Sequence, residues 1–158
     1  MYKSIMHLGF YCKNFDAMVD FYTNKLGGKI KSVVRYGEYI GVKNRPVESA
    51  IGQSNPDKMY YIYIELADGQ FVELYPAKPD QLEHIKFNEH IGYSHFALLV
   101  DDINKEKERL IANGVNPDTQ ISIGPSGTYQ MWIHDPDDNR IEVMQFTDHS
   151  YQVVGHNI

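Results

Sequence analysis

The stretch Asn139-Arg140-Ile141-Glu142-Val143-Met144-Gln145-Phe146 follows an acidic turn, Asp135-Pro136-Asp137-Asp138. Its alternating pattern and its β-forming residues predict a strand after a tight turn. Because the side chains of a strand alternate between its two faces, Glu142 shares one face with Arg140, Met144 and Phe146. An ionised glutamate on such a partly apolar face is costly unless a partner replaces its lost hydration. For one isolated glutamate that partner is ordinarily an arginine or water. Whether Glu142 has a different partner depends on residues elsewhere in the chain.

Composition limits the class of protein. The 158 residues suffice for one well-buried domain or for two small modules that share a core. A formal net charge of −6, with scattered Lys and Arg, argues against nucleic acid and anionic membranes as partners. Cys12 is the only cysteine, which fits a reducing compartment, and no segment has the length of a signal peptide or a membrane span. We therefore expect a soluble, cytoplasmic protein.

The first half of the chain alternates strand and helix signals. Asn14 is a good N-cap for a helix that runs to Leu26, where a glycine pair ends it. Strands are predicted on either side of this helix and in a later hairpin, over residues 4–12, 29–35, 59–66 and 70–75. The region 36–58 is the least regular part, with a possible strand at 38–42.

The second half repeats this order. Asp102 caps a predicted helix that runs to Asn113, and strands are predicted over residues 92–100, 128–134 and 140–146. We read both halves as the pattern β-α-β-β-β, a repeat at the scale of a module, with bounds for four strands in the first half and three in the second. We expect an α+β protein with a first βαβββ module at 1–77, a linker at 78–91, a second module at 92–147 and a tail at 148–158. The first half is longer, and its extra chain is placed in the region 36–58.

The repeat turns one glutamate into a set of four ionisable residues. His7 and Glu73 come from the first half, and His95 and Glu142 from the second. If they converge, two carboxylates and two imidazoles compensate one another only around a cation, because neighbouring carboxylates repel. Two nitrogen and two oxygen ligands suit Ni²⁺ or Zn²⁺, with Co²⁺, Mn²⁺ or Fe²⁺ as alternatives, and leave positions open for water and substrate. Each residue alone is more often structural, so the hypothesis depends on their equivalent positions in the repeat.

The chain resembles the vicinal oxygen chelate superfamily, which includes glyoxalase I, bleomycin-resistance proteins, extradiol dioxygenases and methylmalonyl-CoA epimerase. The matching segments cover most of the chain to about residue 147, and they include Met6-His7-Leu8-Gly9-Phe10, Phe71-Val72-Glu73-Leu74-Tyr75, His95-Phe96-Ala97-Leu98-Leu99 and Asp135 to Glu142. The resemblance implies paired βαβββ modules that form a cupped mixed sheet around one divalent metal. The ligand order His, Glu, His, Glu is similar to that of glyoxalase I.

That resemblance also implies an activity. The expected protein is a metal-dependent lyase or isomerase of the glyoxalase I (lactoylglutathione lyase) type, acting on a 2-oxoaldehyde–thiol adduct or a related hydroxy-ketone through a metal-bound enediolate. Glu142 would move a proton between neighbouring carbons, and Glu73 would be a ligand and a second base. Tyr11 and Ala77 stand where bacterial glyoxalase I has glutathione contacts, which leaves the thiol open. Candidate residues of the substrate pocket are Tyr11, Tyr61, Tyr63, Gln130, Trp132 and Met144.

Two other functions stay open for a chain of this family. One is a non-catalytic binding or resistance protein that sequesters a small aromatic ligand. The other is an extradiol-type dioxygenase, against which Glu73 argues, because those enzymes use two histidines and one carboxylate. Family members often form dimers, so a homodimer is expected, with each site inside one chain or shared between subunits. The remaining histidines show no ligand spacing: His84, His90, His134, His149 and His156.

Overall fold

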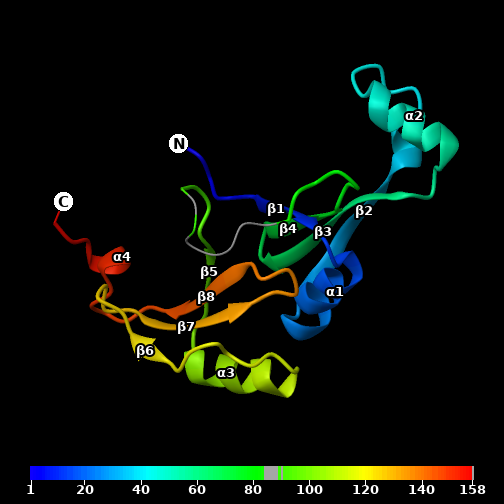
Figure 1. Cartoon of the computed structure of the whole chain (residues 1–158). Coiled ribbons are helices and arrows are strands. Elements are labelled where there is room, and N and C mark those ends of the chain that lie inside the picture. The colour runs from blue at the N-terminus through cyan, green and yellow to red at the C-terminus, as the bar shows by residue number, and fades with distance from the viewer. Residues whose placement is uncertain (84–88, 90, 158) are drawn as a thin grey trace. The chain divides into compact units, whose positions relative to one another are not determined.

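The computed structural model describes residues 1–83, 89 and 91–157. The chain divides into two compact units, Met1–Glu83 and His84–Ile158, and each contains one four-stranded sheet (Figure 1). Each sheet pairs its first strand in parallel with its last, and the other pairings are antiparallel. The predicted α+β fold of two βαβββ modules is confirmed. The exact limits of modules, linker and tail stay predictions, and residues 84–88 and 90 of the linker lie outside the described residues.

The first sheet has the strand order β1-β4-β3-β2. Its strands are β1 (His7–Cys12), β2 (Lys29–Arg35), β3 (Met59–Ala67) and β4 (Gln70–Pro76). The predicted helix after β1 consists of α1 (Phe15–Asp20) and a wider turn, η1 (Phe21–Lys25), and Gly27 follows with a φ of 83°. This positive φ is the left-handed conformation that glycine adopts at little cost, and it ends the helix as predicted.

One face of the first sheet forms the core of its unit. Apolar side chains from β3 and β4 alternate toward α1 and η1, where they meet apolar side chains of the helix. The buried set includes Met18, Phe21, Tyr22, Ile62, Ile64, Val72 and Leu74. Because strand side chains alternate, the residues between these positions point to the opposite face of the sheet. That opposite face carries Glu73 and is called the ligand face below.

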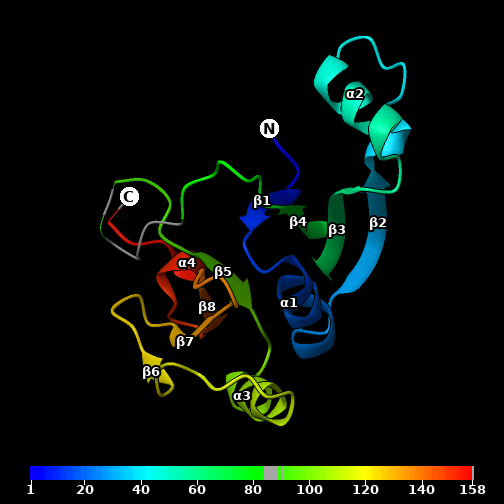
Figure 2. The same ribbon diagram turned by 45° about the vertical axis from the view of Figure 1, so that its right-hand side comes forward.

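The strand predicted at 38–42 is wrong. This segment instead continues from the short helix η2 (Tyr36–Tyr39) into turns closed by hydrogen bonds from Ile40 N–H to Gly37 O and from Val42 N–H to Tyr39 O. A nine-residue helix, α2 (Pro46–Ser54), follows and lies beyond the end of β2 and the start of β3 (Figures 1 and 2). The backbone of 38–42 thus finds local partners and forms no strand ladder.

The second sheet has the order β5-β8-β7-β6. Its strands are β5 (Phe96–Leu99), β6 (Ser122–Ile123), β7 (Tyr129–His134) and β8 (Arg140–Gln145). The helix α3 (Ile103–Ala112) begins at Asp102, as predicted. Met131, Ile133, Ile141 and Val143 are buried on the face toward α3, together with Ile103 and Leu110. The first strand is shorter than the predicted 92–100, so His95 precedes it.

The end of the second unit is anchored through polar contacts. Ser150 and Thr128 are fully buried, the Thr128 hydroxyl donates to Ser150 Oγ at 3.1 Å, and Ser150 Oγ donates to Gly127 O at 3.1 Å. A short helix, α4 (Tyr151–Val154), follows. Within the described part of the chain, no helix combines the length and the apolar character needed to cross a bilayer.

Candidate metal centre

His7 and Glu73 meet on the ligand face of the first sheet. In the parallel pairing of β1 with β4, Gly9 lies opposite Glu73, so His7, two residues earlier, is on the same face. The distance from His7 Nε2 to Glu73 Oε2 is 3.3 Å. Glu73 is 7% exposed, whereas the His7 side chain is 39% exposed. The pair therefore combines a buried carboxylate with an accessible imidazole.

His95 and Glu142 repeat this arrangement in the second unit. Ala97 lies opposite Glu142 in the parallel pairing of β5 with β8, and His95 again stands two residues earlier. The distance from His95 Nε2 to Glu142 Oε2 is 3.5 Å, and Glu142 is 8% exposed. The two halves thus hold their histidine and glutamate in the same register.

The neighbours of the two pairs also correspond. Tyr63 lies opposite Glu73 across β3 and β4, and Trp132 lies opposite Glu142 across β7 and β8. The Tyr63 ring contacts His7 edge-on at 5.5 Å between centroids, and the Trp132 ring contacts His95 edge-on at 4.8 Å. Aromatic rings in this geometry limit the rotation of each imidazole.

Both imidazoles present the same nitrogen to the carboxylate. The other nitrogen, Nδ1, contacts the preceding side chain, at 2.9 Å to Met6 Sδ and at 3.0 Å to Ser94 Oγ. The contact made by the second nitrogen sets the orientation of a metal-bound imidazole. Nε2 is therefore the atom of each histidine that suits a metal.

The carboxylates differ in their remaining contacts. Tyr63, across the strand pair, and Tyr75, two residues along β4, share the face of Glu73. Burial and then the interaction with the Glu73 carboxylate raise the pKa of both phenols well above the ordinary value of tyrosine. The equivalent positions in the second unit hold Trp132 and Met144, which have no hydroxyl. Glu73 thus has two neighbouring phenols on its face that the repeat does not supply to Glu142.

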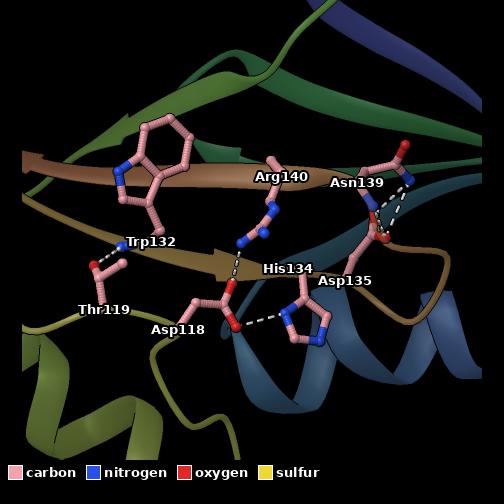
Figure 3. A network of polar contacts seen from close by, with 7 residues as sticks. All are labelled: Asp118, Thr119, Trp132, His134, Asp135, Asn139 and Arg140. Atoms are coloured by element: carbon pink, nitrogen blue, oxygen red, sulfur yellow. Dashed lines mark hydrogen bonds and ion pairs between the residues drawn. The ribbon is translucent and has the colours of Figure 1, made fainter. Parts of the chain in front are cut away.

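Arg140, two residues before Glu142 on β8, forms an ion pair with Asp118. Its Nη1 lies 2.7 Å from Asp118 Oδ2, and His134 Nδ1 lies 2.8 Å from Asp118 Oδ1 (Figure 3). Sequence reasoning missed Asp118, because it belongs to an irregular segment with no motif. This network ties residues 118–119 to β7 and β8.

The turn before β8 explains how Glu142 is placed. Asp135 is 1% exposed, and its Oδ1 accepts a hydrogen bond from the N–H group of Asn139 at 2.9 Å (Figure 3). The same oxygen accepts from the N–H group of Asp137 at 3.0 Å. Asp138 adopts a φ of 62°. An aspartate tolerates this left-handed conformation better than most residues, so the acidic turn predicted from the sequence suits the hairpin.

The predicted pocket residues lie on the two ligand faces. Tyr61 and Tyr63 share the face of Glu73, and Tyr11, 49% exposed, pairs with Tyr75 at the end of β1. Burial raises the pKa of Tyr61 to about 12. In the second unit, Gln130, Trp132 and Met144 share the face of Glu142. Their role in binding a substrate stays a prediction.

Each unit contains one pair made of an imidazole and a carboxylate. Among the residues that the structure describes, no three or more His, Cys, Asp or Glu side chains are grouped so that they could hold one metal ion. A tetrahedral metal site ordinarily takes at least three protein ligands. One pair supplies only two ligands, which is too few for such a site. The predicted four-ligand centre therefore needs both pairs.

Comparison with known families identifies the fold. A family model described as the Glyoxalase/Bleomycin resistance protein/Dioxygenase superfamily matches residues 4–143. The chain belongs to this superfamily. The match includes both histidine–glutamate pairs, so the predicted resemblance is confirmed at the level of the superfamily.

Solved structures of superfamily members share the fold. A glyoxalase family protein from Enterococcus faecalis is 19% identical, with a TM-score of 0.67 over 90% of this chain and 98% of that chain. A lactoylglutathione lyase from Agrobacterium tumefaciens is 20% identical, with a TM-score of 0.58 over 91% and 94% of the two chains. A superfamily protein from Alicyclobacillus acidocaldarius is 16% identical, with a TM-score of 0.59 over 92% of each chain. A search of curated proteins found no match.

Proposed function

We propose that this protein is a metal-dependent lyase or isomerase of the glyoxalase I type, acting on a 2-oxoaldehyde–thiol adduct or a related hydroxy-ketone. The observation that supports the proposal is the repeated pair, His7 with Glu73 and His95 with Glu142, in one register and with one orientation of the imidazole. A structural role requires no such repetition of two buried carboxylates, each beside an accessible histidine.

The donor set fits a divalent metal. Two imidazole nitrogens and two carboxylate oxygens suit Ni²⁺ or Zn²⁺ and leave coordination positions for a substrate. In the proposal His7, Glu73, His95 and Glu142 hold this ion together. When bound, the metal supplies Lewis-acid polarisation of the two adjacent oxygens of the substrate.

The proton transfer is assigned to Glu142. Its carboxylate is nearly buried, touches His95 and has no phenol at the positions equivalent to Tyr63 and Tyr75. A carboxylate with uncommitted lone pairs can take a proton from one carbon and return it to the neighbouring one. Asp135 fixes the turn before β8, which holds this side chain in register.

The thiol partner of the substrate is part of the proposal. Tyr11 stands where an arginine is expected for glutathione, and Lys78 Nζ lies 5.4 Å from the centre of the Tyr11 ring. A cation is thus present beside Tyr11, but it comes from the segment after β4. The substrate panel should therefore include thiols that differ in the position of their negative charges.

The test is turnover of methylglyoxal with glutathione, with bacillithiol and without a thiol, after loading with Ni²⁺ or Zn²⁺. Glu142→Gln should lower kcat by about 10²–10⁴-fold, the usual contribution of a positioned base. Glu65→Gln is the matched control, because Glu65 is another strand glutamate and pairs with Lys31 at 2.9 Å. Absence of turnover with every thiol and both metals would contradict the proposed chemistry.

Sequestration of an aromatic ligand is the second candidate. It is favoured by neighbouring rings on the first sheet, where Tyr75 lies 5.1 Å from Tyr11 and 5.4 Å from Tyr61 between ring centroids. Such rings provide stacking surfaces for a flat ligand. Calorimetric titration with flat aromatic compounds distinguishes the two functions. Tight binding that needs no metal and persists in Glu142→Gln, without turnover, would favour sequestration.

A further inference from the structure

Three tyrosines lie side by side across the ligand face of the first sheet, one on each of three adjacent strands. Tyr11 of β1 pairs in register with Tyr75 of β4, at 5.1 Å between ring centroids. The Tyr75 ring lies 5.4 Å from the ring of Tyr61 on β3. These three residues are called the tyrosine row below. Because adjacent strands are about 4.8 Å apart, the row extends over roughly 10 Å, which suits a molecule with two fused aromatic rings.

The fold itself does not require aromatic side chains at these positions. The second unit repeats the register, with Leu99 opposite Met144 and Met144 opposite Gln130. Leu99, Met144 and Gln130 thus occupy the three positions that correspond to the tyrosine row. Since two aliphatic side chains and an amide serve the same sheet in the second unit, packing alone does not account for three neighbouring tyrosines in the first.

A lysine lies at one end of the tyrosine row. Lys78 Nζ is 5.4 Å from the centre of the Tyr11 ring. The backbone around this lysine is fixed, because Ala77 N–H donates to Cys12 O at 3.0 Å and Lys78 N–H donates to Gln81 Oε1 at 2.7 Å. Among the residues that the structure describes, no aspartate or glutamate forms an ion pair with Lys78. Its charge is therefore available to an anion that approaches the row.

We propose that the tyrosine row and Lys78 form a subsite for a flat aromatic acid, with its rings against the tyrosines and its carboxylate beside Lys78. The inference deepens the proposed function, on which it rests for the use of this face, by naming the chemical class that the face selects. Aromatic rings gain from offset stacking or edge contacts with one another, which provides affinity for the flat body of the ligand. The cation at the end of the row provides the preference for an acid over a neutral molecule.

The orientation of the ligand follows from the charges on the face. Glu73 precedes Tyr75 by two residues on β4 and shares its face, so it repels a carboxylate that lies toward the middle of the sheet. Lys78 attracts the same carboxylate to the Tyr11 end of the row. The acid group is therefore expected beside Tyr11 and the far ring beside Tyr61.

The test is calorimetric titration of the full-length protein with two probes of the same shape, 2-naphthoate and the neutral 2-naphthamide, in the presence of EDTA. The unmodified protein should bind the acid more tightly than the amide. Lys78→Gln should raise the Kd of the acid about threefold to fivefold, the upper range for an exposed ion pair, and leave that of the amide nearly unchanged. Tyr11→Leu should weaken both probes about 2–10-fold, because one ring contact is lost.

Lys58→Gln is the matched control. Lys58 Nζ lies 5.5 Å from the centre of the Tyr36 ring, so this lysine makes the same kind of contact with a tyrosine outside the row. Its variant should bind the acid within about twofold of the unmodified protein, since its charge lies at another ring. Near-UV circular dichroism verifies that each variant retains its fold.

The outcomes separate this inference from the proposed function. If the acid and the amide bind equally well, or if Lys58→Gln weakens the acid as much as Lys78→Gln does, the subsite for an acid is overturned. Binding of neither probe in EDTA also overturns it, and if the acid then binds once Ni²⁺ or Zn²⁺ is added, the metal centre stands without the subsite. Metal-free binding that depends on Lys78 and Tyr11, together with no turnover of any thiol adduct, would uphold the subsite and contradict the proposed chemistry.

Discussion

At the scale of single residues, buried or capping carboxylates act through the hydrogen bonds they accept. Asp102 shows this at the start of α3, where its Oδ1 accepts from the N–H groups of Asn104 at 3.0 Å and Lys105 at 3.1 Å. The backbone hydrogen bond from Lys105 is the largest cause that holds the pKa of Asp102 below its ordinary value. Its charged form is therefore bound more favourably in the folded chain than in the unfolded one.

Asp102→Ala should lower the Tm by roughly 2–4 °C at neutral pH, as expected for loss of an N-cap in a chain of this length. Because the folded-state pKa is depressed, the cap contributes fully above the unfolded pKa, about 3.9, and is lost as pH falls through the folded value. Thermal unfolding from pH 7 to pH 2 should therefore show the difference shrinking below about pH 4. The exposed neighbour Asp101, changed to alanine, is the control. A difference that is constant over this range would contradict the cap.

At the scale of elements, α2 shows where packing overrides helix propensity. Gly52 is buried, and a Cβ atom at this position would collide with the carbonyl oxygen and carbon of Tyr36. These two Tyr36 atoms belong to the backbone, so they cannot rotate away as the end of a side chain could. The glycine thus allows α2 to lie directly against η2.

Gly52→Ala should destabilise the protein although alanine is the better helix former. Propensity alone predicts a gain of about 1 kcal/mol. The collision with Tyr36 predicts a loss of about 1–3 kcal/mol, and backbone contacts place it at the upper end. Urea unfolding followed by circular dichroism measures the net change. Gln53→Ala, at the exposed neighbouring position of α2, should change the free energy of unfolding by less than about 0.5 kcal/mol. A stabilised Gly52→Ala protein would refute the packing argument.

The sequence predicted elements well where local signals agreed. Gly27 and Gly114 both adopt positive φ at the ends of predicted helices, and Asp102 caps α3 as expected. The sequence did not predict the helix α2, because Pro46–Ser54 contains few apolar residues and the helix depends on contact with η2. It also missed Asp118, whose contacts with His134 and Arg140 join positions distant in the chain. Contacts of this kind depend on tertiary packing, which no local pattern encodes.

At the scale of the whole molecule, the repeat has predicted more than the separate residues could. Strand alternation alone places Glu142 on a face, but only the equivalence of the halves pairs it with His95 and predicts the same pair at His7 and Glu73. Within each unit the structure brings the pair together, at 3.3 Å and 3.5 Å. The binding of one ion by both pairs is a proposal, because strand patterns do not encode how the units associate.

One shared ion predicts a stoichiometry. Because neither pair alone reaches the three protein ligands of an ordinary site, we expect one tightly bound metal per chain and not two. Either His7→Ala or His95→Ala should abolish tight binding, and the double variant should be no worse than each single one, since all four residues serve one site. The same result is expected whether the ligands come from one chain or, in the proposed homodimer, from two. Elemental analysis after dialysis against Zn²⁺ or Ni²⁺ measures the ratio. Two metals per chain, each lost with only one histidine, would show that the pairs act separately.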